Sequence, residues 1–137
     1  MDVPAARARC AAARVARLAT VDGGGRPHLV PVTFAVRGDV AAIAVDHKPK
    51  RTTELRRLAN IESNDRVSVL VDHYDDQDWT RLWWVRADGT ARVLRGDDRD
   101  EPIGWLVAKY PQYRARPPAG PVILIEVEVW RGWAAAG

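Results

Sequence analysis

Apolar residues that recur at every second position constrain this chain's fold more than any other feature. The pattern is clearest over 66–72, where Val67, Val69 and Val71 share one face, and it returns over 122–133. A period of two is typical of strands with one buried face. Further strands are expected over 18–21, 27–36 and 40–46, and a hairpin over 80–86 and 90–95 that turns at Ala87-Asp88-Gly89.

Three short helices are expected between the strands. They cover Ala5 to about Ala16, Arg51 to Asn60, and a segment from Asp97 or Asp98 to about Lys109. The strands follow one another through short turns instead of alternating with helices. The sequence therefore predicts a mainly β (α+β) antiparallel barrel or sandwich. Pro31 cannot donate to a ladder, so the second strand is expected to lie at an edge, or to be bulged or broken there.

Length and composition bound the class of protein. A chain of 137 residues with 47% hydrophobic residues predicts one domain over 1–137 with a real core. The single cysteine, Cys10, cannot form an internal disulfide, and no apolar run approaches the roughly 20 residues of a membrane span. The arginines near the N-terminus leave no signal-peptide core. We therefore expect a cytoplasmic protein.

The net charge of +3 permits an anionic partner without requiring one. Arg81 to Arg86 combines arginines with Trp83 and Trp84, as in surfaces that bind single-stranded nucleic acid. Without a basic stripe this interpretation is weak. Alternation puts the two tryptophans on opposite faces of one strand, where one can pack in the core and the other can line a groove or a subunit interface.

The segment Lys48-Pro49-Lys50-Arg51-Thr52-Thr53 is the sharpest candidate site. It lies between a strand and the start of a helix, where free amides and the positive end of the helix dipole favour an anion. From these residues alone, phosphate binding and a solvated basic turn are about equally supported, because Thr52 or Thr53 can also be a simple N-cap.

Other motifs favour structural interpretations. Gly23-Gly24-Gly25 is typical of a hairpin turn and fits no phosphate-binding motif. The acidic run Asp72 to Asp78 fits no EF-hand pattern, so a solvated loop is favoured over a metal site. The histidines and serines form no zinc spacing and no nucleophile elbow. Any chemistry is therefore expected to come from a cofactor, and no catalytic residue is identified.

Taken together, these segments resemble a known family. The strand Leu18 to Asp22, Gly25-Arg-Pro-His28, the strand Leu29 to Phe34, the basic loop Lys48 to Thr52 and the helix Glu54 to Asn60 occur in the order found in the pyridoxamine 5′-phosphate oxidase-like split β-barrel flavin and deazaflavin oxidoreductases. The similarity is greatest to a small actinobacterial branch associated with coenzyme F420, and it extends to about Val129.

The resemblance implies an FMN-binding type split barrel and a homodimer with its cofactor at the subunit interface. Cofactor-binding residues carried over by position fall into three groups. The phosphate would be held by Lys50, Arg51 and Thr52, with Lys48 nearby. The ring or ribityl chain would be bordered by Pro31, Val32, Thr33, Val45, Asp46 and His47. Trp83 or Trp84 would close the pocket, in one version from the partner subunit.

One departure from the family bears on the cofactor. Pyridoxamine-phosphate oxidases carry basic residues in the second strand that clamp FMN, whereas 29–36 contains none. This favours F420 and leaves FMN as the alternative. The expected reaction is hydride transfer between the deazaflavin and a small electron-poor substrate. A non-enzymatic protein that binds flavin, deazaflavin or haem is the second hypothesis, with His28, His47 or His73 as the haem ligand.

Overall fold

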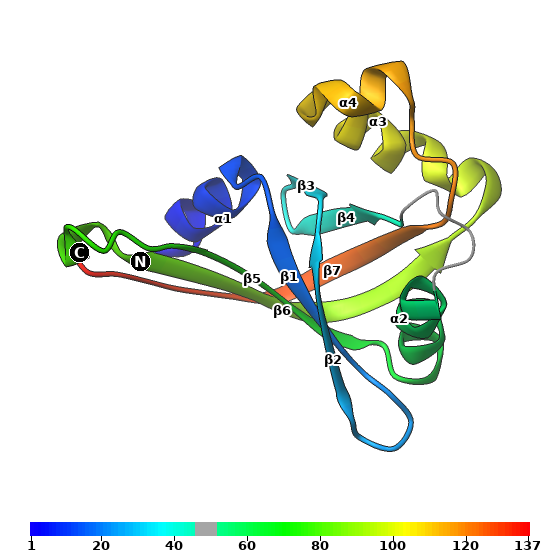
Figure 1. Ribbon diagram of the computed structural model, residues 1–137, viewed down its shortest axis with the longest axis horizontal. Helices are drawn as coiled ribbons and strands as arrows, with labels where there is room; N and C mark the ends of the chain where they lie inside the picture. Colours follow the sequence, from blue (N-terminus) through cyan, green and yellow to red (C-terminus); the bar gives the residue numbers. More distant parts are fainter. Residues whose placement is uncertain (46–51) are drawn as a thin grey trace.

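The computed structural model describes residues 1–45 and 52–137 (Figure 1). Its helices are α1 (Val3–Ala12), α2 (Thr52–Ser63), α3 (Asp100–Lys109) and α4 (Pro111–Ala115), with 3-10 turns η1 (Trp79–Arg81) and η2 (Gly96–Arg99). Its strands are β1 (Ala16–Val21), β2 (Pro27–Val32), β3 (Phe34–Arg37), β4 (Val40–Ala44), β5 (Arg66–His73), β6 (Trp83–Leu94) and β7 (Val122–Ala134). Asp2 caps α1 by accepting the Ala5 N–H at 2.9 Å.

The strands form one antiparallel sheet in the order β2-β1-β5-β6-β7-β4-β3. Figure 1 shows that the sheet curls into a half-barrel, with the long strands β5, β6 and β7 extending to the left, where both termini lie. The split-barrel prediction is confirmed. Because β6 and β7 are 12 and 13 residues long, the two ends of each lie far apart along the sheet.

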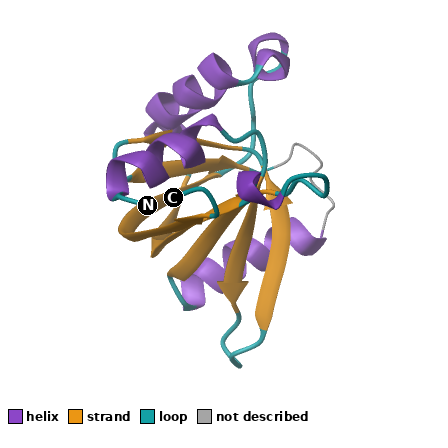
Figure 2. Cartoon of the chain, turned by 90° about the vertical axis from the view of Figure 1, so that its left-hand side faces the viewer, coloured by secondary structure: helices purple, strands orange, loops and turns teal. Residues whose placement is uncertain are grey.

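The concave face of the sheet carries the main core. Leu18, Phe34, Ile43, Val69 and Ile123 are fully or almost fully buried there. Figures 1 and 2 show α2 on one side of the sheet and α3 with α4 on the other. The alternation of 66–72 is therefore a burial pattern, as expected for a half-buried strand.

The expected hairpin at Ala87-Asp88-Gly89 is wrong. β6 runs through these residues as one strand, with a bulge between Asp88 and Gly89 where it pairs with β7. A Cβ on Gly89 would overlap the carbonyl oxygen of Glu126 in β7. The glycine therefore allows two backbones to approach closely, a role that gives the same local sequence signal as a turn.

Two further differences concern the prolines. The predicted strand over 27–36 is two strands, β2 and β3, separated at Thr33, which is consistent with the break expected near Pro31. The four prolines of 111–121 predict a surface connection, and the structure places α4 at its start, because a proline is well tolerated in the first turn of a helix. None of the helices within residues 1–45 and 52–137 is long and apolar enough to cross a membrane.

Candidate functional site

The predicted phosphate-binding residues lie at the edge of what the structure describes. Asp46, His47, Lys48, Lys50 and Arg51 fall outside the described residues. Thr52 is the first residue of α2, and its backbone is helical. The described parts of the candidate site are therefore the residues on either side of this segment.

Four of the residues predicted to border the cofactor ring are described, and they lie together at one end of the sheet. Phe34 pairs with Ile43 in the β3–β4 ladder, so continuing the antiparallel register places Val32 and Thr33 beside the end of β4 and Val45. Val45 is 4% exposed and its N–H donates to the Pro121 carbonyl at 3.2 Å, while Val32 is 5% exposed. These two side chains belong to the wall of the core. Pro31 is exposed and pairs with Arg17 on β1.

Thr33 is a partly buried polar residue at this end. It lies between β2 and β3, and neither ladder gives it a strand partner. Its Oγ1 is half-buried and lies 2.6 Å from the hydroxyl of Tyr113. Among the described residues, Thr33 therefore lies outside the ladders that engage its neighbours, and peptide groups in such a position are suited to bond the edge of a heterocycle.

A tyrosine that sequence reasoning missed holds this end in place. The Tyr110 hydroxyl accepts the Phe34 N–H at 3.1 Å and can donate to the Arg14 carbonyl at 2.9 Å or the Phe34 carbonyl at 3.1 Å. Its ring contacts that of Tyr113 edge to face at 5.5 Å. Burial raises the pKa of Tyr110, so the hydroxyl keeps its proton at neutral pH. The end of α3 is thereby fixed to the start of β3, directly beside Thr33.

Lys109 supports the same junction. Its Nζ donates to the Phe34 carbonyl at 2.9 Å and lies 3.9 Å from the centre of the Phe34 ring. Burial, with the nearby guanidinium groups of Arg14 and Arg37, lowers the pKa of Lys109 to about 8. Burial also raises the pKa of the neighbouring Cys10 thiol to about 11. A lysine that titrates near neutrality is a candidate proton donor only if a ligand reaches it, and its observed contacts are structural.

No local sequence signal marks these two residues. The partners of Tyr110 lie 76 and 96 residues away along the chain, so only the folded sheet brings them together. The sequence predicts a helix that ends at about Lys109, and it assigns no role to Tyr110 just beyond it.

Trp83 and Trp84 lie at the other end of the long strands. In the β6–β7 ladder they pair with Ala134 and Trp133, whereas the start of β7, Val122, pairs with Ala44 beside Val45. The twelve residue steps from Val122 to Ala134 correspond to up to about 40 Å along a strand. Among the described residues, the ladders therefore place the tryptophans at the opposite end of β7 from Val32, Thr33 and Val45.

The two tryptophans face opposite sides of the sheet, as the alternation predicted. Trp83 packs against the core and stacks on His73 with ring centroids 6.3 Å apart, and the Arg9 guanidinium lies 5.3 Å from its ring centre. These side chains line an open cavity of about 410 Å³ with Thr80, Arg81, Leu82, Ala134 and Ala136. Its cationic and aromatic lining suits a planar or anionic group.

Trp84 belongs to the convex face, which carries a group of exposed apolar side chains. Strand register places these residues on the same face as Trp84. They are Leu29 (66% exposed), Leu70 (38%), Val129 (38%) and Trp133 (47%). We call them the convex apolar face. The same register places the ion pair Arg86–Asp88 between them, so this face combines exposed apolar and charged side chains, as surfaces that pack against another protein do.

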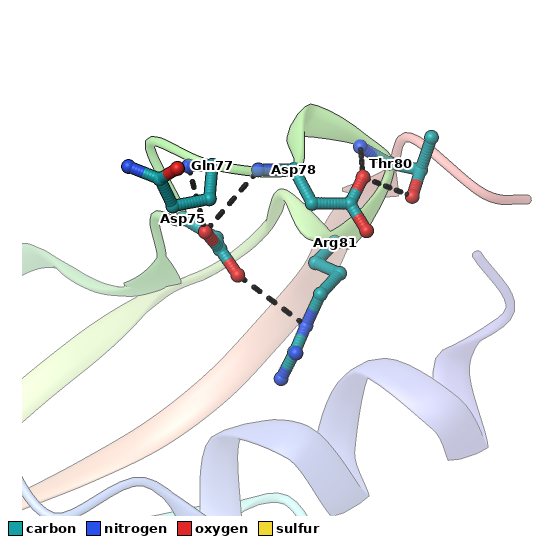
Figure 3. Close-up of polar contacts among 5 residues, drawn as sticks. All are labelled: Asp75, Gln77, Asp78, Thr80 and Arg81. Carbon is teal, nitrogen blue, oxygen red and sulfur yellow. Dashed lines mark hydrogen bonds and ion pairs between the residues drawn. The ribbon is translucent and has the colours of Figure 1, made fainter.

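The acidic loop before Trp83 is organised by its own side chains (Figure 3). The Asp75 carboxylate accepts the N–H groups of Gln77 and Asp78 and lies 3.6 Å from Nε of Arg81. Asp78 accepts the N–H and hydroxyl of Thr80, and these bonds lower the pKa of Asp78. Among residues 1–45 and 52–137, no three His, Cys, Asp or Glu side chains are placed to hold a metal ion.

Comparisons with known proteins agree with this geometry. A model of the pyridoxamine 5′-phosphate oxidase family matches residues 3–134. A 5a,11a-dehydrotetracycline/5a,11a-dehydrooxytetracycline reductase of Streptomyces rimosus is 33% identical over 84 residues, which are 61% of this chain and 58% of that reductase. The chain thus spans less than two thirds of the length of this relative.

Solved structures show the same fold. A conserved hypothetical protein of Mycobacterium tuberculosis superimposes with a TM-score of 0.74 at 20% identity, over 98% of this chain and 86% of that one. A FAD-binding protein of Mesorhizobium loti gives 0.71 at 20% identity, over 96% and 94%. A heme binding protein of Mycobacterium smegmatis gives 0.70 at 18% identity, over 95% and 56%. One architecture therefore carries different ligands, and the fold alone does not select among them.

Proposed function

Because the chain belongs to the pyridoxamine 5′-phosphate oxidase family, we propose that it is an oxidoreductase that transfers a hydride between coenzyme F420 and a small electron-poor organic molecule. The family match over 3–134 carries the proposal, and the similarity to a reductase supports the direction of the reaction. FMN is the alternative cofactor, supported by neighbours that bind flavins. A cytoplasmic location remains a prediction from the sequence.

The residues around the β2–β3 break fit a flavin or deazaflavin ring. Val32 and Val45 provide an apolar wall, and Thr33 offers backbone groups outside the ladders together with a hydroxyl held by Tyr113. Residues 29–36, which form most of β2 and β3, carry no basic side chain. The phosphate is assigned to Lys50, Arg51 and Thr52, with Lys48 nearby, and Asp46 and His47 border the ribityl chain. These assignments rest on the sequence.

When bound, the cofactor supplies the hydride-transfer chemistry. The protein would contribute orientation and exclusion of water. Tyr110 and Lys109 fix the start of β3, and thereby fix Thr33 against the cofactor ring. No described side chain at this end is placed as a catalytic acid, so the proton that accompanies the hydride is assigned to solvent.

A complete site is proposed to need two copies of the chain. Trp83 and the β2–β3 break lie at opposite ends of the β7 ladder, up to about 40 Å apart along the strand, so we infer that Trp83 joins the cofactor site from a second subunit. The convex apolar face gives such a subunit a surface to cover. We assign the closing role to Trp83, because it lines the cavity with Arg9 and His73, and the interface role to Trp84.

The proposed function is tested by titrating the protein separately with F420 and FMN, followed by fluorescence. We expect micromolar binding of F420 and much weaker binding of FMN. Lys50→Ala/Arg51→Ala should weaken F420 binding by well over tenfold, since two charge-assisted contacts to phosphate are removed. The matched control, Arg92→Ala/Arg116→Ala, removes two exposed cations away from the described site residues and should bind normally.

Activity is then measured with reduced F420 and a panel of electron-poor acceptors that includes dehydrotetracyclines. Acceptor-dependent oxidation of F420 is the expected result. Preferred binding of FMN would move the protein to the flavin-dependent alternative. Binding of neither molecule would contradict the proposed function.

A further inference from the structure

A second polar cavity lies between the β1–β2 hairpin and α2. It has a volume of about 350 Å³ and is lined by Asp22, Arg26, Pro27, His28, Arg56 and Asn60. The side chain of Asn60, which lines the cavity, is held in place because its amide donates to the buried Thr20 hydroxyl at 3.0 Å. The cavity is therefore formed by a strand pair and a helix that are linked by a buried hydrogen bond.

His28 presents one ring nitrogen for a ligand. Its Nδ1 is buried and has no hydrogen-bond partner among the described residues, whereas Nε2 is not among the buried unpaired atoms. A buried N–H without an acceptor is rarer in proteins than a buried lone pair without a donor. The proton of the neutral ring is therefore expected on Nε2, which leaves an N–H donor for a ligand in the cavity.

The charges around His28 favour an anion. Burial lowers the pKa of His28, and the positive charges of Arg56 and Arg57 on α2 lower it further. From the hairpin, Arg26 adds a third cation beside the carboxylate of Asp22.

That carboxylate is already engaged. Asp22 accepts the N–H groups of Gly24 and Arg26 at 2.8 and 2.9 Å, and it lies 3.4 Å from Nε of Arg26. These contacts, together with the positive charge of Arg56, lower the pKa of Asp22. Within the described part of the chain, Arg56 has no carboxylate at ion-pair distance, so the N–H groups of its guanidinium can donate to a ligand.

We propose that this cavity binds an oxyanion, the phosphate or carboxylate group of a small molecule, between the guanidinium of Arg56 and the Nε2–H of His28. Arg26 contributes a further positive charge at the rim. A planar guanidinium and a ring N–H are donors that suit oxyanions. The proposal does not depend on the proposed cofactor, because none of these residues belongs to the assigned cofactor site.

The test uses inorganic phosphate and acetate as separate probes on the whole protein, with sodium chloride at equal ionic strength as the blank. The ring signals of the histidines are followed by NMR. Before any addition, the nitrogen spectrum should show the Nε2–H tautomer of His28. Phosphate should shift the His28 signals in a saturable manner and raise the pKa of His28, while His73 at the opposite end of the sheet stays unchanged.

Two variants and a control make the test specific. Arg56→Gln and His28→Leu should each weaken phosphate binding by roughly tenfold, the amount expected for one charge-assisted hydrogen bond. Arg116→Gln, an exposed arginine after α4, should bind like the wild type. Because Arg56 is exposed, its variant keeps the fold even if His28→Leu does not. Shifts that sodium chloride reproduces, or unchanged affinity in Arg56→Gln, would overturn the proposal.

A competition experiment identifies the source of the oxyanion. If FMN displaces phosphate from His28, the site takes the acidic group of a larger ligand. If both bind together, the site takes a separate small anion.

Discussion

The hydroxyl of Tyr110 should contribute more to stability than its small size suggests. Tyr110→Phe removes one oxygen and leaves the N–H of Phe34 without a partner at a residue that is 0% exposed. An unpaired buried donor costs about 1–3 kcal/mol, whereas the Arg14 carbonyl is at an exposed residue and can bond water. We therefore expect the free energy of unfolding to fall by about 2 kcal/mol.

This free energy corresponds to a shift of melting temperature that is easily measured. An unfolding entropy of ~2.1 cal/mol/K per residue gives about 0.29 kcal/mol/K for this chain, so 2 kcal/mol lowers the Tm by about 7 °C. Urea unfolding followed by circular dichroism, at fixed protein concentration, gives the free energy directly. The matched control is Tyr74→Phe. Tyr74 is 60% exposed, and its hydroxyl donates to the Asp76 carboxylate.

Tyr74→Phe should change stability by less than about 0.5 kcal/mol. A Tyr110→Phe variant as stable as Tyr74→Phe would refute the reasoning, because it would show that the Phe34 N–H does not depend on this hydroxyl.

Three further predictions concern the bulge, the buried lysine and the convex apolar face. Gly89→Ala should destabilise the protein by at least about 3 kcal/mol in urea unfolding, because the added Cβ overlaps the β7 backbone. The control Gly104→Ala has open space around the new Cβ in α3 and should stabilise the protein by up to about 1 kcal/mol. Equal effects of the two substitutions would contradict the bulge geometry. The pKa of Lys109 is about 8 in the folded protein and 10.5 in the unfolded chain, so between these pH values the unfolded chain binds more protons and Lys109 makes the free energy of unfolding rise with pH. In urea unfolding at pH 7.5–10.5, the free energy of the wild type minus that of Lys109→Met should therefore rise with pH. A difference that does not change with pH would contradict this prediction. Leu70→Asp on the convex apolar face should shift sedimentation from two chains to one, and Leu70→Asp sedimenting like the wild type would argue against this face as the interface.

Local sequence patterns predicted the strands and their burial, but not how the chain uses glycine at the sheet. Alternation over 66–72 became β5 because a half-buried strand needs only a local pattern. Gly89 was predicted as a turn because close approach to Glu126, 37 positions later, leaves no mark near the glycine. Thr33 lies at a strand break that could be predicted from Pro31, since a proline disturbs the ladder at its own position.

The candidate site was predictable only in part, because some of its contacts join residues far apart in the sequence. Pro31, Val32, Thr33 and Val45 lie at one end of the β3–β4 pair, and neighbouring strands made that proximity foreseeable. The role of Tyr110 depends on contacts across most of the chain, which no window of sequence contains.

The separation of Trp83 from that end depends on the length and register of β7, which continues past the barrel to Ala134. Strand existence could be predicted from the sequence. Strand register over twelve residues could not.

Subunit mixing tests most directly the claim that two copies complete each cofactor site. The variants are Lys50→Ala/Arg51→Ala, which damages one half of the site, and Trp83→Leu, which damages the other and retains an apolar side chain against the core. If the halves come from different subunits, every heterodimer contains one undamaged site. An equal mixture with random exchange should recover about one quarter of the wild-type number of tight F420 sites. Complete subunit exchange with no recovery of tight binding would contradict the claim.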